Sequence, residues 1–135
     1  MLHVYADGGY SAATEKAAYA YAIYDTAGQL LAQHAAWVPE SRSNNQMEYL
    51  GATEGLLESL TRFKDPQVTL FSDSQLLVEQ YHGRYQCKDP TLQELLAHLR
   101  FVASMAEVEV VWIPREKNTY TDALVKAVIL PKVKA

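Results

Sequence analysis

The sequence predicts an α/β fold in which helices cover a mixed five-stranded sheet, and three observations carry this prediction. The first third of the chain alternates apolar and polar residues with the period of two that is typical of strands. After it, short apolar segments alternate with segments of helical periodicity, which favours parallel strands joined by helices. The 135 residues, 49% apolar and 21% charged, suit one globular domain over residues 1–135.

Three strands are predicted before the first helix. Residues 2–10 alternate up to two glycines, and residues 16–25 place tyrosines and an isoleucine on one face and alanines on the other. Residues 25–28 form a turn signal, and residues 29–38 return as the third strand. Because parallel pairing needs a long crossover, these short links predict an antiparallel meander.

The rest of the chain predicts six further elements. They are a helix over 46–61, a strand over 67–72, a helix over 74–81, a helix opening at Asp89-Pro90, a strand over 108–113, and a helix that begins near Thr119 and ends at Pro131. The order is therefore β-β-β-α-β-α-α-β-α, and we expect the last two strands to be parallel. Ligands of such open sheets gather at the carboxyl ends of the parallel strands.

Composition excludes several classes of protein. The single cysteine, Cys87, rules out an internal disulfide framework and suits a reducing compartment. No apolar run approaches membrane-spanning length, and residues 1–7 lack a basic leader and an apolar signal core. We therefore expect a cytoplasmic protein with no membrane association and no obligate protein partner.

Four carboxylates stand where one predicted element gives way to the next: Asp7, Glu48, Asp73 and Asp122. No Lys or Arg lies within three residues of the first three to compensate their charge locally. Acids brought together by folding repel one another unless something positive lies between them. Mg²⁺ prefers such oxygen ligands and is commonly paired with phosphate substrates. The four acids therefore predict a metal site if folding brings them together.

Each acid also has a structural interpretation. Residues 45–48 and 119–122 fit capping boxes that would use Glu48 and Asp122, and Asp73 could cap the helix after its strand. Asp7 is harder to explain in this way, because an Asp inside or just after an apolar strand costs stability unless it is paired. Asp7 is therefore the strongest single candidate for a functional role.

Net charge bears on the partner. The chain carries 16 acids against 12 Lys and Arg, a formal charge of −4. Setting aside the four candidate ligands leaves 12 acids, so the rest of the surface is neutral. Phosphate contacts use Lys and Arg, so we expect nucleic-acid binding to be modest and salt-sensitive.

Four motifs, in this order and spacing, resemble those of type 1 ribonuclease H. They are Val4-Tyr5-Ala6-Asp7-Gly8-Gly9, Asn44-Asn45-Gln46-Met47-Glu48-Tyr49, Phe71-Ser72-Asp73-Ser74, and Ile113-Pro114-Arg115-Glu116-Lys117-Asn118 leading to Asp122-Ala123-Leu124. The resemblance covers nearly the whole chain. It is closest to the shorter bacterial and archaeal members and to the related domains of reverse transcriptases. It implies the ribonuclease H-like fold.

The resemblance also implies an activity. The chain would be an endoribonuclease that uses two Mg²⁺ ions, with Mn²⁺ as a substitute, to cut the RNA strand of an RNA/DNA hybrid and leave 5′-phosphate and 3′-hydroxyl ends. Asp7 would bridge both ions, Glu48 and Asp73 would complete the first site, and Asp122 would hold the second. The alternative is a catalytically weak or inactive hybrid-binding module on the same fold. An aspartate-phosphorylated receiver domain also uses strand-end acids, but it predicts an all-parallel sheet.

Substrate contacts are implied at eight positions: Gly8, Gly9, Asn44, Asn45, Gln46, Ser74, Arg115 and Asn118. The amide side chains at the start of the first helix would read the minor groove, where the RNA strand displays 2′-hydroxyls that an amide can donate to and accept from. Double-stranded RNA is a second candidate substrate.

The chain departs from the family pattern in two places. Residues 114–121 hold no histidine, and Arg115 would stand in for it, binding phosphate but unable to act as a base. The basic protrusion of longer relatives is missing, since residues 82–90 hold only two cations, so we expect weak substrate affinity.

Other notable side chains are predicted to have ordinary roles. Trp37 and Trp112 end predicted strands and are interpreted as core residues. The four histidines are interpreted as packing or surface residues. A basic C-terminal tail is either solvated or follows a nucleic-acid backbone; its members are Lys126, Lys132 and Lys134.

Overall fold

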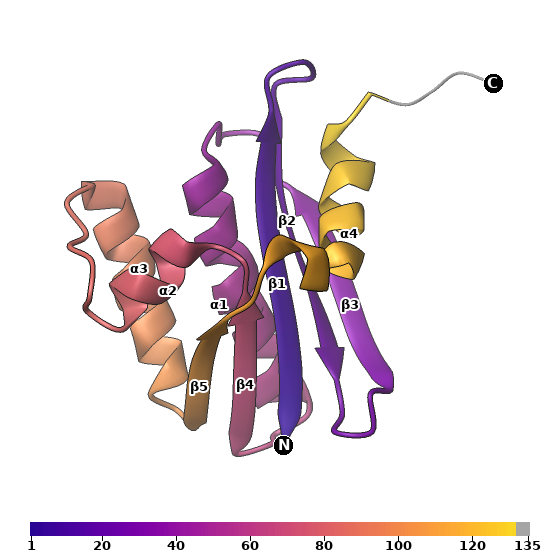
Figure 1. Ribbon diagram of the computed structural model, residues 1–135, viewed down its shortest axis with the longest axis vertical. Helices are drawn as coiled ribbons and strands as arrows, with labels where there is room; N and C mark the ends of the chain where they lie inside the picture. The colour runs from indigo at the N-terminus through magenta and orange to yellow at the C-terminus, as the bar shows by residue number, and fades with distance from the viewer. Residues whose placement is uncertain (132–135) are drawn as a thin grey trace.

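The computed structural model describes residues 1–131 and confirms the predicted order of elements (Figure 1). The elements are β1 (Leu2–Ser11), β2 (Lys16–Tyr24), β3 (Leu30–Trp37), α1 (Asn44–Arg62), β4 (Gln67–Ser72), α2 (Gln75–Tyr81), α3 (Pro90–Ala103), β5 (Glu107–Trp112), a 3₁₀ turn η1 (Arg115–Lys117) and α4 (Thr119–Ile129). The 3₁₀ turn lies in the predicted loop before α4. Lys132 and Lys134 of the predicted basic tail lie outside the described residues.

The five strands form one mixed sheet in the order β3-β2-β1-β4-β5. The first three strands pair antiparallel, whereas β4 is parallel to both β1 and β5. This topology confirms the predicted meander and excludes the all-parallel sheet of a receiver domain. It also places the carboxyl end of β4 beside the middle of β1, with Ala6 opposite Ser72, so that Asp7 and Asp73 follow the last paired residues.

The helices form two unequal layers (Figure 1). α1 packs on β1 and β2, with α3 packed against α1, while α4 lies across β1, β2 and β3 on the other face. The main core lies beneath α1 and includes Val4, Leu56 and Leu70, all fully buried. A smaller core lies beneath α4, where Val125 and Ile129 pack against the alanine face of β2. The alternation predicted for β2 therefore serves two different helices.

Two glycines let β1 and α1 approach closely. A Cβ at Gly8 would stand 2.3 Å from the carbonyl carbon of Met47, and one at Gly51 would stand 2.7 Å from the carbonyl oxygen of Asp7. Any larger residue would push the helix away from the strand. This contact brings Asp7 beside Glu48.

Asp89 caps α3 as predicted, but other residues than the predicted ones stand at the N-termini of α1, α2 and α4. Ser43 caps α1 by accepting from the backbone N–H of Gln46 at 3.2 Å, and Ser74 caps α2 by accepting from Leu77 at 3.1 Å. Asn118 precedes α4 and makes no side-chain cap hydrogen bond. The capping interpretation is therefore wrong for all three acids to which it applied: Glu48, Asp73 and Asp122.

The prediction that the two tryptophans are core residues is wrong. Trp37 is 52% exposed and Trp112 is 47% exposed. Both end the edge strands of the sheet, each of which has a neighbouring strand on one side only. Lys16 Nζ lies 5.3 Å from the centre of the Trp37 ring, and the Trp112 indole N–H donates to the carbonyl of Asp73 at 3.2 Å.

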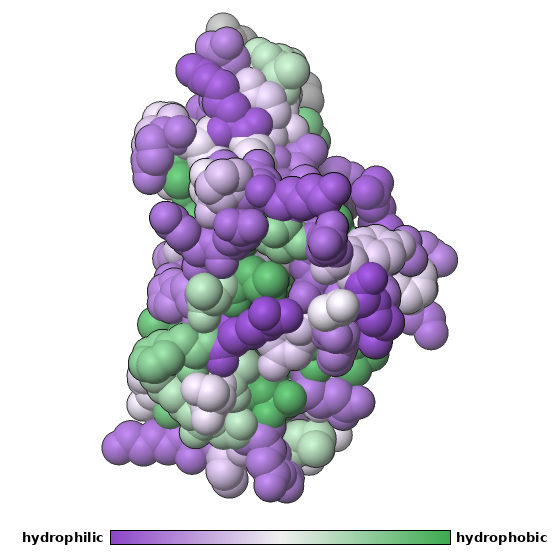
Figure 2. All heavy atoms as spheres, turned by 90° about the vertical axis from the view of Figure 1, so that its left-hand side faces the viewer, coloured by the Kyte–Doolittle hydropathy of each residue, from purple (hydrophilic) through white to green (hydrophobic). Residues whose placement is uncertain are grey.

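Hydrophilic residues dominate the side of the molecule that β5, α2 and α3 form, with separate apolar patches between them (Figure 2). Phe101 and Met105, at the end of α3, are more than half exposed. Within residues 1–131, none of the helices has the length and apolar character needed to cross a bilayer.

Candidate functional site

A cavity of about 560 Å³ opens at the carboxyl ends of β1 and β4, between the start of α1 and the inner face of α4. All four candidate carboxylates line it: Asp7, Glu48, Asp73 and Asp122. Each reaches the cavity from a different element, since β1, α1, the end of β4 and α4 supply one acid apiece. Folding therefore brings together the residues that the sequence singled out.

Three of the four acids form a tight cluster. Asp7, Glu48 and Asp73 each place one carboxylate oxygen so that these atoms all lie within 4.8 Å of one another. Asp122 lines the same cavity but stands outside this cluster, and its Oδ2 lies 2.8 Å from Lys126 Nζ. The site thus has a compact set of three acids and one separate acid with its own cation.

Within residues 1–131, no cationic side chain offsets the charge of Asp7 or Glu48. Asp7 is 5% exposed, and burial, followed by the charge of Asp73, raises its pKa to about 7. Burial and the charges of Asp7 and Asp73 raise the pKa of Glu48 well above its ordinary value. Glu48 Oε2 is buried without a hydrogen-bond partner among residues 1–131. Three acids in this state need a cation or a proton.

Asp73 is the acid that receives the most local support. Burial raises its pKa, while a hydrogen bond from Asn118 and the charge of Arg115 act in the opposite direction. The Asn118 side chain is buried and donates from Nδ2 to Asp73 Oδ2 at 3.1 Å and to the Ala6 carbonyl at 2.9 Å. Asn118 therefore holds the middle of β1 and the end of β4 in a fixed relationship.

These residues fit a hard divalent cation. The donors are carboxylate oxygens, which Mg²⁺ and Mn²⁺ accept and which softer ions do not favour. The unpartnered oxygen of Glu48 and the raised pKa of Asp7 are the features that a bound cation would relieve.

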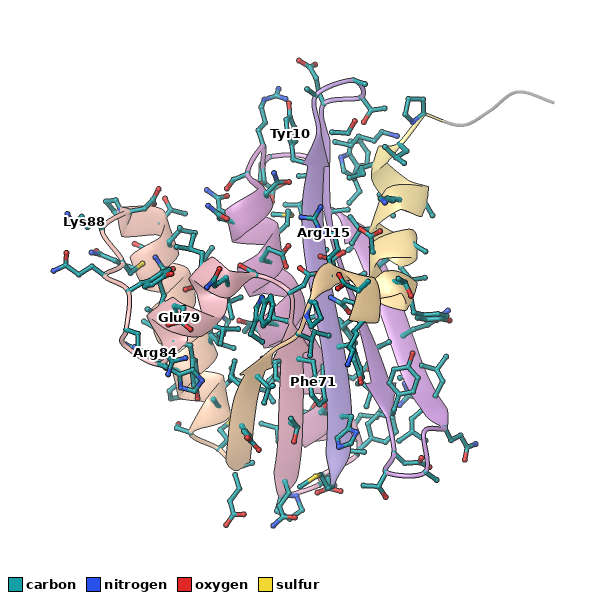
Figure 3. The ribbon with its side chains drawn as sticks, in the orientation of Figure 1. Tyr10, Phe71, Glu79, Arg84, Lys88 and Arg115 are labelled. Carbon is teal, nitrogen blue, oxygen red and sulfur yellow. The ribbon has the colours of Figure 1, made fainter. Side chains whose placement is uncertain are left out.

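Most of the predicted substrate contacts also line the cavity: Gly8, Gly9, Asn44, Asn45, Ser74 and Arg115. Gln46 and Asn118 do not. Gln46 accepts a hydrogen bond from the Ser41 hydroxyl at 3.0 Å, and Asn118 is buried behind Asp73. Figure 3 shows Arg115 in front of β1, between α1 and α4.

Residues 82–90, where longer relatives carry a basic protrusion, offer less free positive charge than their two cationic residues indicate. Arg84 donates two hydrogen bonds to the Glu79 carboxylate, at 2.6 and 2.9 Å. Figure 3 shows this pair on the α2 side of the molecule, away from Arg115, with Lys88 at its outer edge.

The prediction that Lys126 belongs to a basic C-terminal tail is wrong. Lys126 lies within α4 and lines the cavity. Its spacing of four residues from Asp122 was the signal that could have identified the pair, because side chains at i and i+4 are neighbours on a helix.

Comparison with known proteins agrees with the fold and the motifs. The family model described as reverse transcriptase-like matches residues 5–128. The bifunctional protein Rv2228c of Mycobacterium tuberculosis is 31% identical over 126 residues, which are 88% of this chain and 33% of that protein. Ribonuclease HI of Halobacterium salinarum is 27% identical over 124 residues, 91% of this chain and 61% of that protein. The chain thus spans about a third of the mycobacterial relative.

Solved structures show the same architecture. The crystal structure of LC11-RNase H1 in complex with RNA/DNA hybrid matches with a TM-score of 0.86 and 32% identity, covering 96% of each chain. The family match over residues 5–128 includes all four candidate carboxylates. The chain therefore belongs to the reverse transcriptase-like family and is, in sequence and fold, a type 1 ribonuclease H domain.

Proposed function

We propose that this chain is a metal-dependent endoribonuclease that cuts the RNA strand of RNA/DNA hybrids. The observation that carries the proposal is the cluster of Asp7, Glu48 and Asp73. One oxygen of each acid lies within 4.8 Å of the others, and Glu48 Oε2 is buried with no hydrogen-bond partner in the described part of the chain. A purely structural trio of acids would be unfavourable, because each raises the energy of the others in their charged forms. The match to a ribonuclease H1 solved with RNA/DNA hybrid supports the choice of substrate.

The four carboxylates would divide between two cation sites. Asp7, on the central strand, would serve both; Glu48 and Asp73 would complete the first, and Asp122 the second. Two cations, roughly 3.5–4 Å apart in sites of this kind, stabilise the attacking and leaving oxygens of an in-line displacement at phosphorus. Water would attack the phosphorus and the 3′ oxygen would leave, which gives 5′-phosphate and 3′-hydroxyl ends.

The remaining cavity residues would bind and orient the substrate. Arg115 is always charged, so it would bind a backbone phosphate beside Asp73 and would not remove a proton. Asn44 already uses its Oδ1 to accept from the Tyr10 N–H at 2.6 Å, which fixes the side chain and leaves its amide N–H groups to donate to the minor groove. Asn45 is exposed at the same helix start.

Backbone geometry supports the same surface. Gly8 and Gly9 follow Asp7 on β1 and line the cavity, where the strand backbone would meet the backbone of the nucleic acid. Ser74 uses its hydroxyl oxygen as the α2 cap, so its hydroxyl proton is free to donate toward the cavity.

A cleavage assay tests the proposal. The purified chain would be incubated with end-labelled RNA/DNA hybrid, double-stranded RNA and double-stranded DNA, each with Mg²⁺, Mn²⁺ or EDTA. We expect cleavage of the RNA strand of the hybrid, dependence on the divalent ion, and no cut in double-stranded DNA. The new 5′ ends should accept a labelled phosphate from a kinase only after phosphatase treatment, because they already carry a phosphate.

Matched variants make the assay specific. Asp7→Asn should lose at least about 100-fold in rate, a loss of the size seen when one charge-stabilising group is removed from an active site. Glu94→Gln removes a carboxylate from the exposed surface of α3 and should cut like the parent. Hybrid binding without turnover in either metal would instead identify the chain as a binding module, and equal cutting by Asp7→Asn would contradict the proposal.

A further inference from the structure

Asp122 differs from the other three acids because it already has a cation. Its Oδ2 lies 2.8 Å from Lys126 Nζ, one helical turn further along α4. Both residues line the cavity that holds the acidic cluster. The ion pair therefore stands inside the candidate active site.

This ion pair differs from an ordinary surface pair in the charged side chains that surround it. Among residues 1–131, the cavity is lined by four carboxylates and two cationic side chains, Arg115 and Lys126. Burial raises the pKa of Asp73 and the charge of Arg115 opposes this rise, whereas Lys126 pairs with Asp122. The ammonium group of Lys126 thus occupies a coordination position of the one acid outside the three-acid cluster.

Building on the function proposed above, we propose that the ammonium group of Lys126 competes with the second divalent cation for the carboxylate of Asp122. The ammonium group occupies Asp122 while that cation is absent and must leave before Asp122 can bind the ion. Lys126 thereby sets how much metal is needed to fill the second site. Once released, the same ammonium group lies at the rim of the cavity and provides a positive charge for the substrate backbone.

The pair has the properties that such a competitor needs. The Lys126 side chain is 57% exposed and that of Asp122 is 29% exposed, so the contact is weak and opens easily. A lysine has a flexible four-carbon stem and binds as a point charge, so it can move without disturbing the helix. A solvated ion pair of this kind changes the affinity of a competing cation by about twofold to fivefold.

The test measures metal binding directly. Free Mn²⁺ would be followed by electron paramagnetic resonance during titration of the parent, Lys126→Gln, Lys126→Arg and Lys88→Gln proteins at low ionic strength. We expect the parent to show a tighter and a weaker site. In Lys126→Gln the weaker site should tighten by about twofold to fivefold. Lys126→Arg keeps the charge and should bind like the parent.

Lys88→Gln is the matched control, since it removes the same charge from an exposed position that does not line the cavity. Its isotherm should coincide with that of the parent. Hybrid binding, measured in Ca²⁺ to prevent turnover, should weaken in Lys126→Gln while metal binding strengthens. A residue that only stabilises α4 would change neither quantity.

The outcomes separate this inference from the proposed function. If Lys126→Gln and the parent bind Mn²⁺ identically, or if Lys88→Gln shifts the isotherm as much, the inference is wrong even when the parent cuts hybrid normally. If the parent binds Mn²⁺ but leaves hybrid intact, the proposed function fails, and the shift in the isotherm still decides the role of Lys126.

Discussion

Asn118 and Asp73 lie 45 residues apart in sequence, and the Asn118 amide holds the Asp73 carboxylate at 3.1 Å while also holding the Ala6 carbonyl at 2.9 Å. The side-chain oxygen of Asn118 in turn accepts from the Thr121 hydroxyl. One buried side chain thus connects β1, the end of β4 and the start of α4. Three of the four acids depend on those elements for their positions.

Replacing this side chain should affect both stability and turnover. We expect Asn118→Ala to lower the free energy of unfolding by about 1–3 kcal/mol, because buried polar groups lose their partner. We also expect it to reduce kcat more than KM, since Asp73 loses its support. Urea denaturation and steady-state cleavage would measure the two effects. Asn45→Ala, at an exposed position, should leave the unfolding midpoint unchanged, and an Asn118→Ala protein as stable as the parent would show that the clamp is dispensable.

Gly8 should tolerate no side chain. A Cβ there would stand 2.3 Å from the Met47 backbone, so Gly8→Ala must separate β1 from α1. We expect a loss of at least about 2 kcal/mol or a failure to fold, as for severe overpacking. Gly9→Ala is the matched comparison. Its Cβ would meet only the ends of the Val125 and Ile129 side chains, at 3.1 and 3.2 Å, and should cost less. Thermal unfolding of the two variants would decide, and the reverse order would contradict the packing argument.

The pKa of Asp7 predicts how stability without metal depends on pH. The pKa rises from 3.8 to about 7 on folding, so between these values the folded state holds the proton more tightly than the unfolded state does. The free energy of unfolding of the metal-free protein should therefore fall as pH rises from about 4 through 7 and then level off. Asp7→Asn removes this dependence and should be more stable than the parent at about pH 8 but not at about pH 4. Urea denaturation in EDTA across this range would measure it; parallel curves would contradict it.

Trp112 should contribute less to stability than a buried tryptophan. Because it is 47% exposed, we expect Trp112→Phe to cost on the order of 1 kcal/mol, mainly through the hydrogen bond to the Asp73 carbonyl. Removal of a core aromatic residue costs about 3–5 kcal/mol. Trp37→Phe, on the opposite edge strand, loses no such bond among the described residues and should be nearly neutral. Denaturant midpoints of Trp112→Phe and Trp37→Phe would measure both losses. A loss above about 3 kcal/mol for Trp112→Phe would show that the indole is a core group.

The order of elements and the identity of the acids were predictable because both depend on local pattern. Period-two alternation marked β1 and β2, and an Asp that ends an apolar strand is costly unless a partner or a cation stabilises it. The cap of α3 at Asp89 was predicted, whereas the caps of α1 and α2 were not, because short motifs fit several registers. Ser43-Asn44-Asn45-Gln46 fits a capping box as well as residues 45–48 do, and the structure uses Ser43.

What the sequence could not supply are contacts between distant segments. The bonds from Asn118 to Ala6 and Asp73 span 112 and 45 residues, and no periodicity encodes them. The exposure of Trp37 and Trp112 depends on which strands lie at the edges, and that follows from the whole sheet order. The pairing of Lys126 with Asp122 was local, but its importance depends on the cavity that surrounds it.

The sheet order also bears on how the molecule would lose activity under mild stress. β1 and β4 are each paired with a strand on both sides, so Asp7 lies within one interior strand and Asp73 directly follows the other, while β3 and β5 form the edges. Backbone amides of interior strands exchange with solvent through large openings, whereas edges open locally at little cost. Opening of β3 would therefore leave two of the acids in place. In hydrogen-exchange terms, the protection of β1 should approach the global limit, and loss of the acidic cluster should coincide with unfolding of the whole domain.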